Sequence, residues 1–178
     1  IVVDQMRYDY IFKYWDKFSD DGLKRLVKEG FFCKNTNYNY VPTYTGPGHA
    51  SIYTGTAPSV HGIVGNDWYD RNSKSMMYCT EVKSELAPAK FSSTGEMSPQ
   101  NMLTTSVCDE LRLATNNKSK VIGIALKDRG AILPAGHSAN AAYWFDSGNG
   151  NWISSTYYMK TLPEWVIEFN KKETAKKY

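Results

Sequence analysis

The stretch SPQNMLTTSVCDELRLATNNKSKVIGIALKDRG, residues 98–130, decides the fold class. It begins with a serine and a proline, which favour the cap and the first position of a helix, so a helix is predicted over residues 98–116. One side of that helix would carry the apolar residues Met102, Val107, Leu111 and Leu113. The apolar run at residues 120–126 then predicts a strand, and the polar residues KDRG follow directly. A helix, then a strand with polar residues at its end, indicates an α/β protein.

The N-terminal residues extend this pattern. Residues 1–3 are β-branched and precede Asp4, as in a buried parallel strand whose carboxyl end carries an acid. Residues 19–30 predict a helix that ends at Gly30, and the aromatic residues of 31–41 predict a second strand. We therefore expect a mostly parallel sheet flanked by helices.

Two segments have the pattern of antiparallel hairpins beside that sheet. Residues 65–82 contain the turn dipeptide Asn72-Ser73, and residues 141–158 contain Ser-Gly-Asn-Gly between two aromatic runs. Residues 81–95 are predicted to form a long connection.

Composition excludes several classes of protein. The chain has 178 residues, 42% hydrophobic and 22% charged, so it can bury a core and is not disordered. Its net charge of +3 is spread along the chain, which argues against a nucleic-acid partner. No apolar run approaches the ~20 residues of a membrane span. The three cysteines, Cys33, Cys79 and Cys108, follow no metal or disulfide spacing and are predicted to be buried free thiols.

Thr45 is the first candidate for chemistry. It lies in VPTYTGPGHASIYTGT, residues 41–56, between a strand-like run and a helix predicted to begin near Gly48. A hydroxyl there would face the free N–H groups at a helix start, which bind anions such as phosphate. From position alone a helix cap is the favoured interpretation. A threonine nucleophile also needs a base or a metal ion to activate it.

Asp4 is the candidate metal ligand, with a strand-end cap as its alternative. The histidines His49, His61 and His137 have no zinc-binding spacing, so structural roles in loops and helices are predicted for them.

Lys127 and Arg129 stand two residues apart after a predicted strand, where alternate side chains share a face. Two cations that project together suit a doubly charged phosphate, whereas a polar loop paired with Asp128 is the simpler alternative. Asn66 could donate an amide hydrogen bond to a ligand, although asparagine after glycine is also common in turns.

Three motifs together resemble a known family. VVDQMRYDY, VPTYTGPGHASIYTGTAPSVHGIVGNDWYD and ALKDRGA are similar to motifs of the type I phosphodiesterase and alkaline phosphatase superfamily, specifically the PafA-type bacterial alkaline phosphatases with a threonine nucleophile. The resemblance runs from Ile1 to about Trp152 and implies the N-terminal portion of a single catalytic domain. The chain begins without Met and ends without a stop signal, so truncation at both ends is expected.

The resemblance implies a phosphomonoesterase with two zinc ions and a phosphothreonine intermediate. Asp4 and Thr45 would bind zinc, and Thr45 would attack phosphorus. Asn66, Lys127 and Arg129 would hold the non-bridging phosphoryl oxygens. The family's remaining zinc ligands have no counterpart here, so this chain by itself is expected to be inactive.

The resemblance also bears on substrate and location. Within the superfamily, a lysine and arginine pair accompanies monoesterases, so phosphomonoesters are the expected substrates and phosphodiesters the alternative. A different hypothesis is a non-catalytic protein that binds a phosphorylated ligand through the Thr45 loop, Lys127 and Arg129. A periplasmic or secreted location is expected by resemblance.

Overall fold

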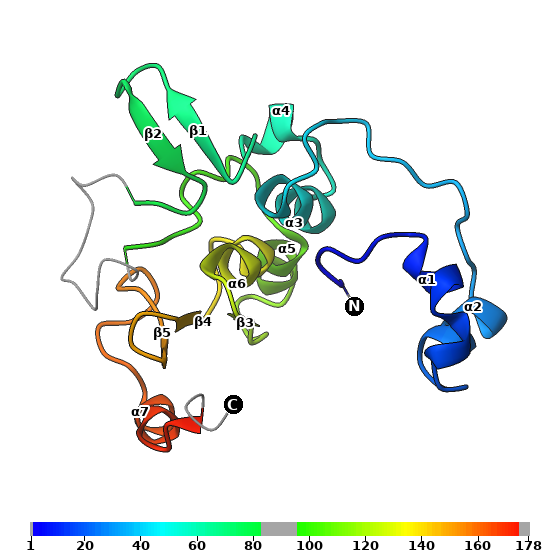
Figure 1. The fold of residues 1–178 in the computed structure, drawn as a ribbon. Helices are drawn as coiled ribbons and strands as arrows, with labels where there is room; N and C mark the ends of the chain where they lie inside the picture. The colour runs from blue at the N-terminus through cyan, green and yellow to red at the C-terminus, as the bar shows by residue number, and fades with distance from the viewer. Residues whose placement is uncertain (1, 83–95, 175–178) are drawn as a thin grey trace. The chain divides into compact units, whose positions relative to one another are not determined.

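The computed structural model describes residues 2–82 and 96–174. The chain divides into two compact units, Ile1–Val41 and Pro42–Tyr178. The first unit contains α1 (Tyr10–Lys13), a 3-10 turn (Trp15–Lys17) and α2 (Leu23–Glu29) (Figure 1). The helix predicted within residues 19–30 is therefore confirmed, and Gly30 is its C-cap.

Both strands predicted in the first unit are wrong for the residues described. Residues 2–3 and 31–41 have no strand hydrogen-bond ladder. Phe32 instead packs its ring against Tyr8 and Phe12. β-Branched and aromatic residues form a strand only where a partner strand completes the ladder.

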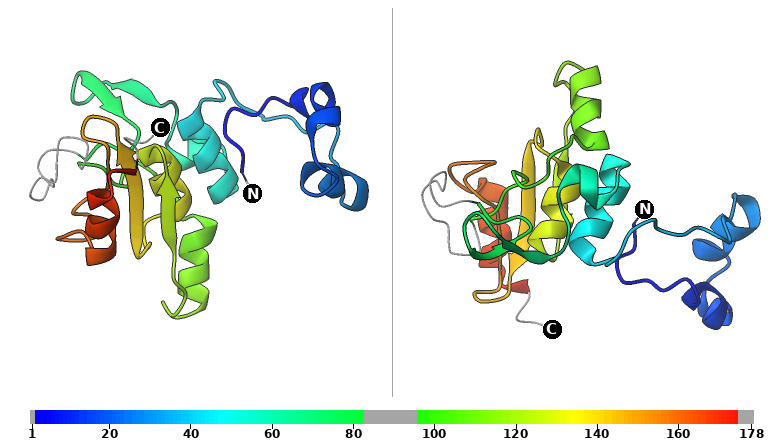
Figure 2. Two further views of the ribbon diagram at one scale, coloured as in Figure 1. Left: turned by 60° about the horizontal axis from the view of Figure 1, so that its bottom comes forward. Right: turned by 90° about the horizontal axis from the view of Figure 1, so that it is seen from above.

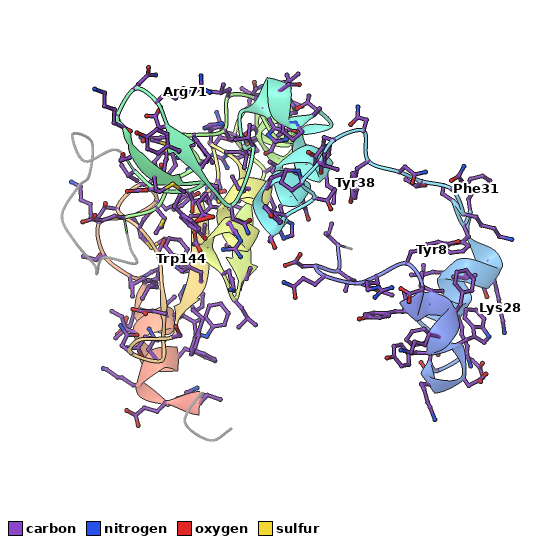
Figure 3. The ribbon with its side chains drawn as sticks, turned by 45° about the horizontal axis from the view of Figure 1, so that its top comes forward. Tyr8, Lys28, Phe31, Tyr38, Arg71 and Trp144 are labelled. Carbon is purple, nitrogen blue, oxygen red and sulfur yellow. The ribbon has the colours of Figure 1, made fainter. Side chains whose placement is uncertain are left out.

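The first predicted hairpin is confirmed in the second unit. Strands β1 (Asp67–Asp70) and β2 (Ser75–Tyr78) pair antiparallel. Asp70 closes the turn, since its carboxylate accepts hydrogen bonds from the backbone N–H groups of Asn72 and Ser73. Arg71 lies at the tip of this hairpin (Figure 3).

A second sheet contains β3 (Ile122–Ala125), β4 (Ala141–Asp146) and β5 (Asn151–Ile153) in that order. β3 pairs parallel with β4, and β4 pairs antiparallel with β5. The predicted strand at 120–126 and the hairpin at 141–158 are thus confirmed. The expected place of that hairpin is wrong, because β4 belongs to the main sheet.

Helices cover both faces of this sheet. α6 (Asp128–Ala135) packs Ala131 and Ile132 against Ala142 and Trp144 on one face. α7 (Glu164–Lys171) packs on the other face, where the core cluster consists of Ala141, Tyr143 and Val166. The alternation along β4 explains why its first four residues are all buried. Figure 3 shows Trp144 in this interior, and its side chain is only 3% exposed.

A third layer of helices lies on the side of α6 away from the sheet (Figure 2). It contains α3 (Thr45–Thr54), α4 (Pro58–His61) and α5 (Val107–Ala114). Ala50 of α3 and Leu133 of α6 share a core cluster with Ile63, Cys79 and Met102. This packing places the first turn of α3 beside the start of α6.

The helix predicted over residues 98–116 begins later than expected. Ser106 caps α5, because its side chain accepts from the N–H of Asp109 while Asp109 accepts from the N–H of Ser106. This reciprocal cap fixes the helix start more strongly than a Ser-Pro pair alone. Residues 98–106 therefore form turns and loop.

The cysteine prediction is correct in part. All three cysteines are free thiols, but only Cys79 is buried, whereas Cys33 is exposed and Cys108 intermediate. Within the described ranges, no helix is long and apolar enough to cross a membrane. The long connection predicted for residues 81–95 lies mostly outside the described residues.

Candidate active site

Thr45 is the first residue of α3, so the helix begins three residues before the predicted start near Gly48. Its N-cap is Tyr44, whose backbone is extended, and the cap interpretation of Thr45 is therefore wrong. Thr45 is half-buried, while Gly46 and Pro47 behind it are buried. Thr45 thus belongs to the first turn of the helix, the end at which the free N–H groups carry the positive end of the dipole.

Gly46 and Asn66 lock this turn to the residue before β1. The backbone N–H of Gly46 donates to Oδ1 of Asn66 at 2.8 Å. A Cβ atom on Gly46 would stand 3.0 Å from the carbonyl oxygen of Gly65, 3.2 Å from Asn66 Oδ1 and 3.3 Å from Cys79 Sγ. The absence of a side chain at Gly46 therefore allows Asn66 to approach its backbone. Because Oδ1 of Asn66 is used in this hydrogen bond, Nδ2 is the atom that can donate to a ligand.

Residues at the end of β2 continue the network. The N–H of Cys79 donates to the carbonyl oxygen of Asn66 at 2.8 Å. Burial raises the pKa of the Cys79 thiol to about 12, and the negative charge of Asp128 adds to this shift. Cys79 is thus a neutral core side chain beside Gly46 and Asn66.

Arg129 stands in the first turn of α6 and is held by Tyr78. Its Nη1 donates to the Tyr78 hydroxyl at 2.7 Å, and that hydroxyl donates to Asp128 Oδ1 at 3.0 Å. Asp128 also accepts a hydrogen bond from Thr80 Oγ1. Burial disfavours the charge on Arg129, but the hydrogen bond to Tyr78 and the electrostatic attraction of neighbours such as Asp128 together outweigh it and raise the pKa of the guanidinium. The polar-loop alternative is wrong for Arg129, because Tyr78 stands between the guanidinium and Asp128.

Lys127 is the exposed N-cap of α6, with extended backbone, and Arg129 follows inside the helix. Strand alternation is therefore not what relates the two residues, because β3 already ends at Ala125. Both cations nevertheless stand at the start of one helix, a position that favours an anion.

The contacts between α3 and α6 bring four candidates into one region. A Cβ atom on Gly130 would stand 3.8 Å from Nε2 of His49, so the two helix starts approach closely there. Hydrogen bonds join Gly46 to Asn66, Asn66 to Cys79, and Tyr78 to Arg129. Asp4 differs, since it lies exposed in a turn of the first unit.

The predicted structural roles of two histidines are confirmed. His61 is fully buried, with Nε2 2.9 Å from Ser51 Oγ, and its Nδ1 accepts from the N–H of Ile63 at 3.1 Å. Burial lowers the pKa of His61, so this ring is neutral and joins α3 to α4. Nε2 of His137 lies 3.2 Å from the carbonyl oxygen of Thr104.

The described residues do not form a zinc site by themselves. Within residues 2–82 and 96–174, no group of three or more His, Cys, Asp or Glu side chains could hold a metal ion. Structural zinc takes four ligands and catalytic zinc takes three from the protein. Asp4 and Thr45 would supply only two ligands, fewer than a structural or a catalytic zinc site takes from the protein.

Tyr78 and Thr80 are residues of the candidate site that the sequence did not indicate, and Asp128 was indicated only as the partner of a polar loop. Tyr78 is 51 positions from Arg129, and nothing in the motif MMYCT marks its hydroxyl as a partner of an arginine. Only the packing of the β1–β2 hairpin beside α6 brings the two side chains together.

Comparison with known proteins now identifies the family. Residues 1–177 match the family Type I phosphodiesterase / nucleotide pyrophosphatase. Over 178 residues the chain is 54% identical to a Myroides odoratus protein named calcium-transporting ATPase and 51% identical to the alkaline phosphatase PhoV of Synechococcus elongatus. Each alignment covers 100% of this chain and 32% of the relative.

The three-dimensional structure supports the same family assignment. It superposes with a TM-score of 0.89 on the crystal structure of a four-residue mutant of the alkaline phosphatase PafA, at 46% identity, covering 97% of this chain and 34% of that one. The predicted α/β class is thereby confirmed, and the chain spans about a third of the length of these relatives. The chain therefore belongs to the type I phosphodiesterase / nucleotide pyrophosphatase family, and alkaline phosphatases are among its relatives.

Proposed function

We propose that this chain supplies the nucleophile and the phosphoryl-binding residues of a phosphomonoesterase. The observation that carries the proposal is the hydrogen bond from Gly46 to Asn66, which fixes an amide donor beside the first turn of α3, where Thr45 stands. The PafA mutant supports it, because its four substitutions fall on a threonine, an asparagine, a lysine and an arginine in that order. The lysine and arginine are two positions apart there, as Lys127 and Arg129 are here.

The proposed reaction has two steps on phosphorus. Thr45 Oγ1 forms a bond to phosphorus while the bond from phosphorus to the alcohol oxygen breaks, and the alcohol leaves with a proton. Water then attacks the phosphothreonine, and Thr45 and inorganic phosphate are released. Asn66, Lys127 and Arg129 bind the non-bridging oxygens, where preorganised donors stabilise the charge of the transition state.

Zinc dependence is part of the proposal for the whole protein. Two bound zinc ions would supply a lowered pKa for the nucleophile and charge stabilisation on the leaving oxygen. Asp4 and Thr45 are the ligands proposed from this chain, and the described residues do not complete a site around them. Zinc content of the full natural gene product tests this part separately from the nucleophile.

A periplasmic or secreted location is proposed on the resemblance to alkaline phosphatases.

Phosphodiester hydrolysis is the alternative activity, in keeping with the name of the family. Two cations at the start of α6 favour the doubly charged monoester. Replacing Lys127 and Arg129 by alanine should therefore reduce kcat/KM for a monoester more than for a diester. Equal losses for p-nitrophenyl phosphate and bis-p-nitrophenyl phosphate would remove the reason to prefer a monoesterase.

The nucleophile is tested by Thr45→Ala in the full natural gene product. Turnover of p-nitrophenyl phosphate should fall to the background rate, because no other group is proposed to attack phosphorus. Thr43→Ala is the matched control, since Thr43 is exposed and lies two residues before α3. Thr45→Ala activity close to that of Thr43→Ala would contradict the assignment.

A further inference from the structure

The hydroxyl of Tyr78 holds Arg129 without an ion pair. It accepts from Nη1 of Arg129 at 2.7 Å and donates to Asp128 at 3.0 Å, so both its hydrogen-bonding capacities are used. Thr80 binds the second carboxylate oxygen of Asp128. The hydrogen bond to Asp128 thus fixes the Tyr78 hydroxyl, and the hydroxyl in turn fixes the guanidinium of Arg129.

The opposite edge of the guanidinium has no hydrogen-bond partner among the described residues. Among the described residues, Arg129 makes its hydrogen bond through Nη1 alone, and its buried Nε has no partner. No carboxylate in the described ranges forms a direct ion pair with it. The Nε and Nη2 edge is the fork with which arginine binds two oxygens of one phosphoryl group.

A neutral phenol is a better holder for such an arginine than a carboxylate. A carboxylate would compete with phosphate for the same donors and cancel part of the charge, whereas a hydroxyl orients the guanidinium and leaves its charge intact. Fixing a long side chain before the ligand arrives also lowers the entropy lost on binding.

The protonation state of Tyr78 supports this role. Burial raises the pKa of its hydroxyl, and the charge of Asp128 adds to the effect, although the hydrogen bond from Arg129 acts in the opposite direction. The hydroxyl therefore stays protonated at alkaline pH and continues to donate to Asp128.

We propose that Tyr78 is a positioning residue that turns the Nε and Nη2 edge of Arg129 toward the phosphoryl group. This inference rests on the proposed function and adds a residue to it. Tyr78 touches neither phosphorus nor the leaving group, and it acts only through Arg129.

The test is Tyr78→Phe in the full natural gene product, because phenylalanine keeps the ring and removes the hydroxyl. We expect kcat/KM for p-nitrophenyl phosphate to fall about 10- to 100-fold, the range of a lost contact to a charged group. Inhibition by inorganic phosphate should weaken in the same direction. The ratio of monoester to diester kcat/KM should fall, which a general loss of folding would not produce.

Tyr69→Phe is the matched control, since Tyr69 is on the same hairpin and is 58% exposed. It should match the wild type. The double variant with Arg129→Ala completes a cycle, in which Tyr78→Phe should add less than about twofold to the loss caused by Arg129→Ala. Wild-type kinetics in Tyr78→Phe, or an equal loss with and without Arg129, would overturn the positioning role.

The cycle also separates this inference from the function it rests on. Activity retained by both Thr45→Ala and Arg129→Ala would overturn the proposed function together with the role of Tyr78. Activity lost in both but kept in Tyr78→Phe would overturn the role of Tyr78 alone.

Discussion

Asn66 has two groups with separate tasks. Its Oδ1 accepts from the N–H of Gly46, and its Nδ2 is proposed to donate to the phosphoryl group. Asn66→Asp keeps the acceptor and removes the donor, so stability should change little while kcat/KM falls about 100-fold or more. Asn66→Ala removes both, and its free energy of unfolding should also fall by about 1 kcal/mol.

Steady-state kinetics and denaturant unfolding of the two Asn66 variants provide the measurement. The donor role is contradicted by an Asn66→Asp enzyme with wild-type kcat/KM. Equal stability of both variants would show instead that the hydrogen bond to Gly46 does not matter for folding.

Cys79 is expected to be inert in the native protein. Its side chain is fully buried, and burial raises its pKa to about 12, so almost no thiolate exists at pH 8. Alkylation with iodoacetamide followed by peptide mapping should modify Cys79 only after unfolding. Modification of Cys79 in the folded protein at the rate of a free thiol would mean that this core opens.

At the level of the elements, the first turn of α3 carries two glycines in different surroundings. A Cβ atom on Gly46 would crowd Gly65, Asn66 and Cys79, whereas one on Gly48 would meet nothing within 4 Å. Gly46→Ala should therefore displace Asn66 and lower both stability and kcat/KM. Gly48→Ala should raise the free energy of unfolding by about 0.5–1 kcal/mol, because alanine is the better helix former.

Thermal unfolding of the two glycine variants in parallel distinguishes these outcomes. A Gly46→Ala protein as stable as Gly48→Ala would show that the close approach of Asn66 is not required.

The elements also show what local sequence could predict. Both hairpins follow from their turn residues, and α2 follows from its apolar spacing and Gly30. The start of α5 was missed, because the reciprocal cap of Ser106 and Asp109 decides it. The strands expected at residues 1–3 and 31–41 depended on partners that local sequence does not show.

For the molecule as a whole, Asp109 joins α5 to the loop after α6. Its side chain is 2% exposed and accepts from Ser106 and from both the N–H and the hydroxyl of Ser138. Burial alone would raise the pKa of Asp109, but these hydrogen bonds outweigh it and hold the pKa below its ordinary value. This carboxylate therefore stabilises the fold above about pH 4 and loses that effect as the pH falls through its folded pKa.

Asp109→Asn should accordingly lower the free energy of unfolding at pH 7 by about 2 kcal/mol, since buried donors lose a charged acceptor. The difference from the wild type should shrink as the pH falls through the folded pKa of Asp109, because the carboxyl then becomes neutral in the wild type as well. Urea unfolding at several pH values measures it, with the exposed Glu168→Gln on α7 as control. Equal stability of the wild type and Asp109→Asn at pH 7 would contradict this role.

Some residues of the candidate site can be predicted from the sequence, and others cannot. Thr45, Asn66, Lys127 and Arg129 follow from a family resemblance, because the motifs preserve the order and spacing of these residues. Tyr78 could not be predicted, since its hydroxyl meets Arg129 only when β2 packs beside α6. Contacts between residues far apart in sequence are set by the tertiary structure and leave no local pattern.

Thr45 is proposed to carry the phosphoryl group during turnover. The most direct measurement is acid quenching of the full natural gene product during hydrolysis of a phosphomonoester, followed by proteolysis and peptide mass spectrometry. We expect a phosphoryl group on Thr45 of the wild type and none when Thr45→Ala is quenched in the same way. Steady turnover with Thr45 unmodified, or with the phosphoryl group on another side chain, would contradict it.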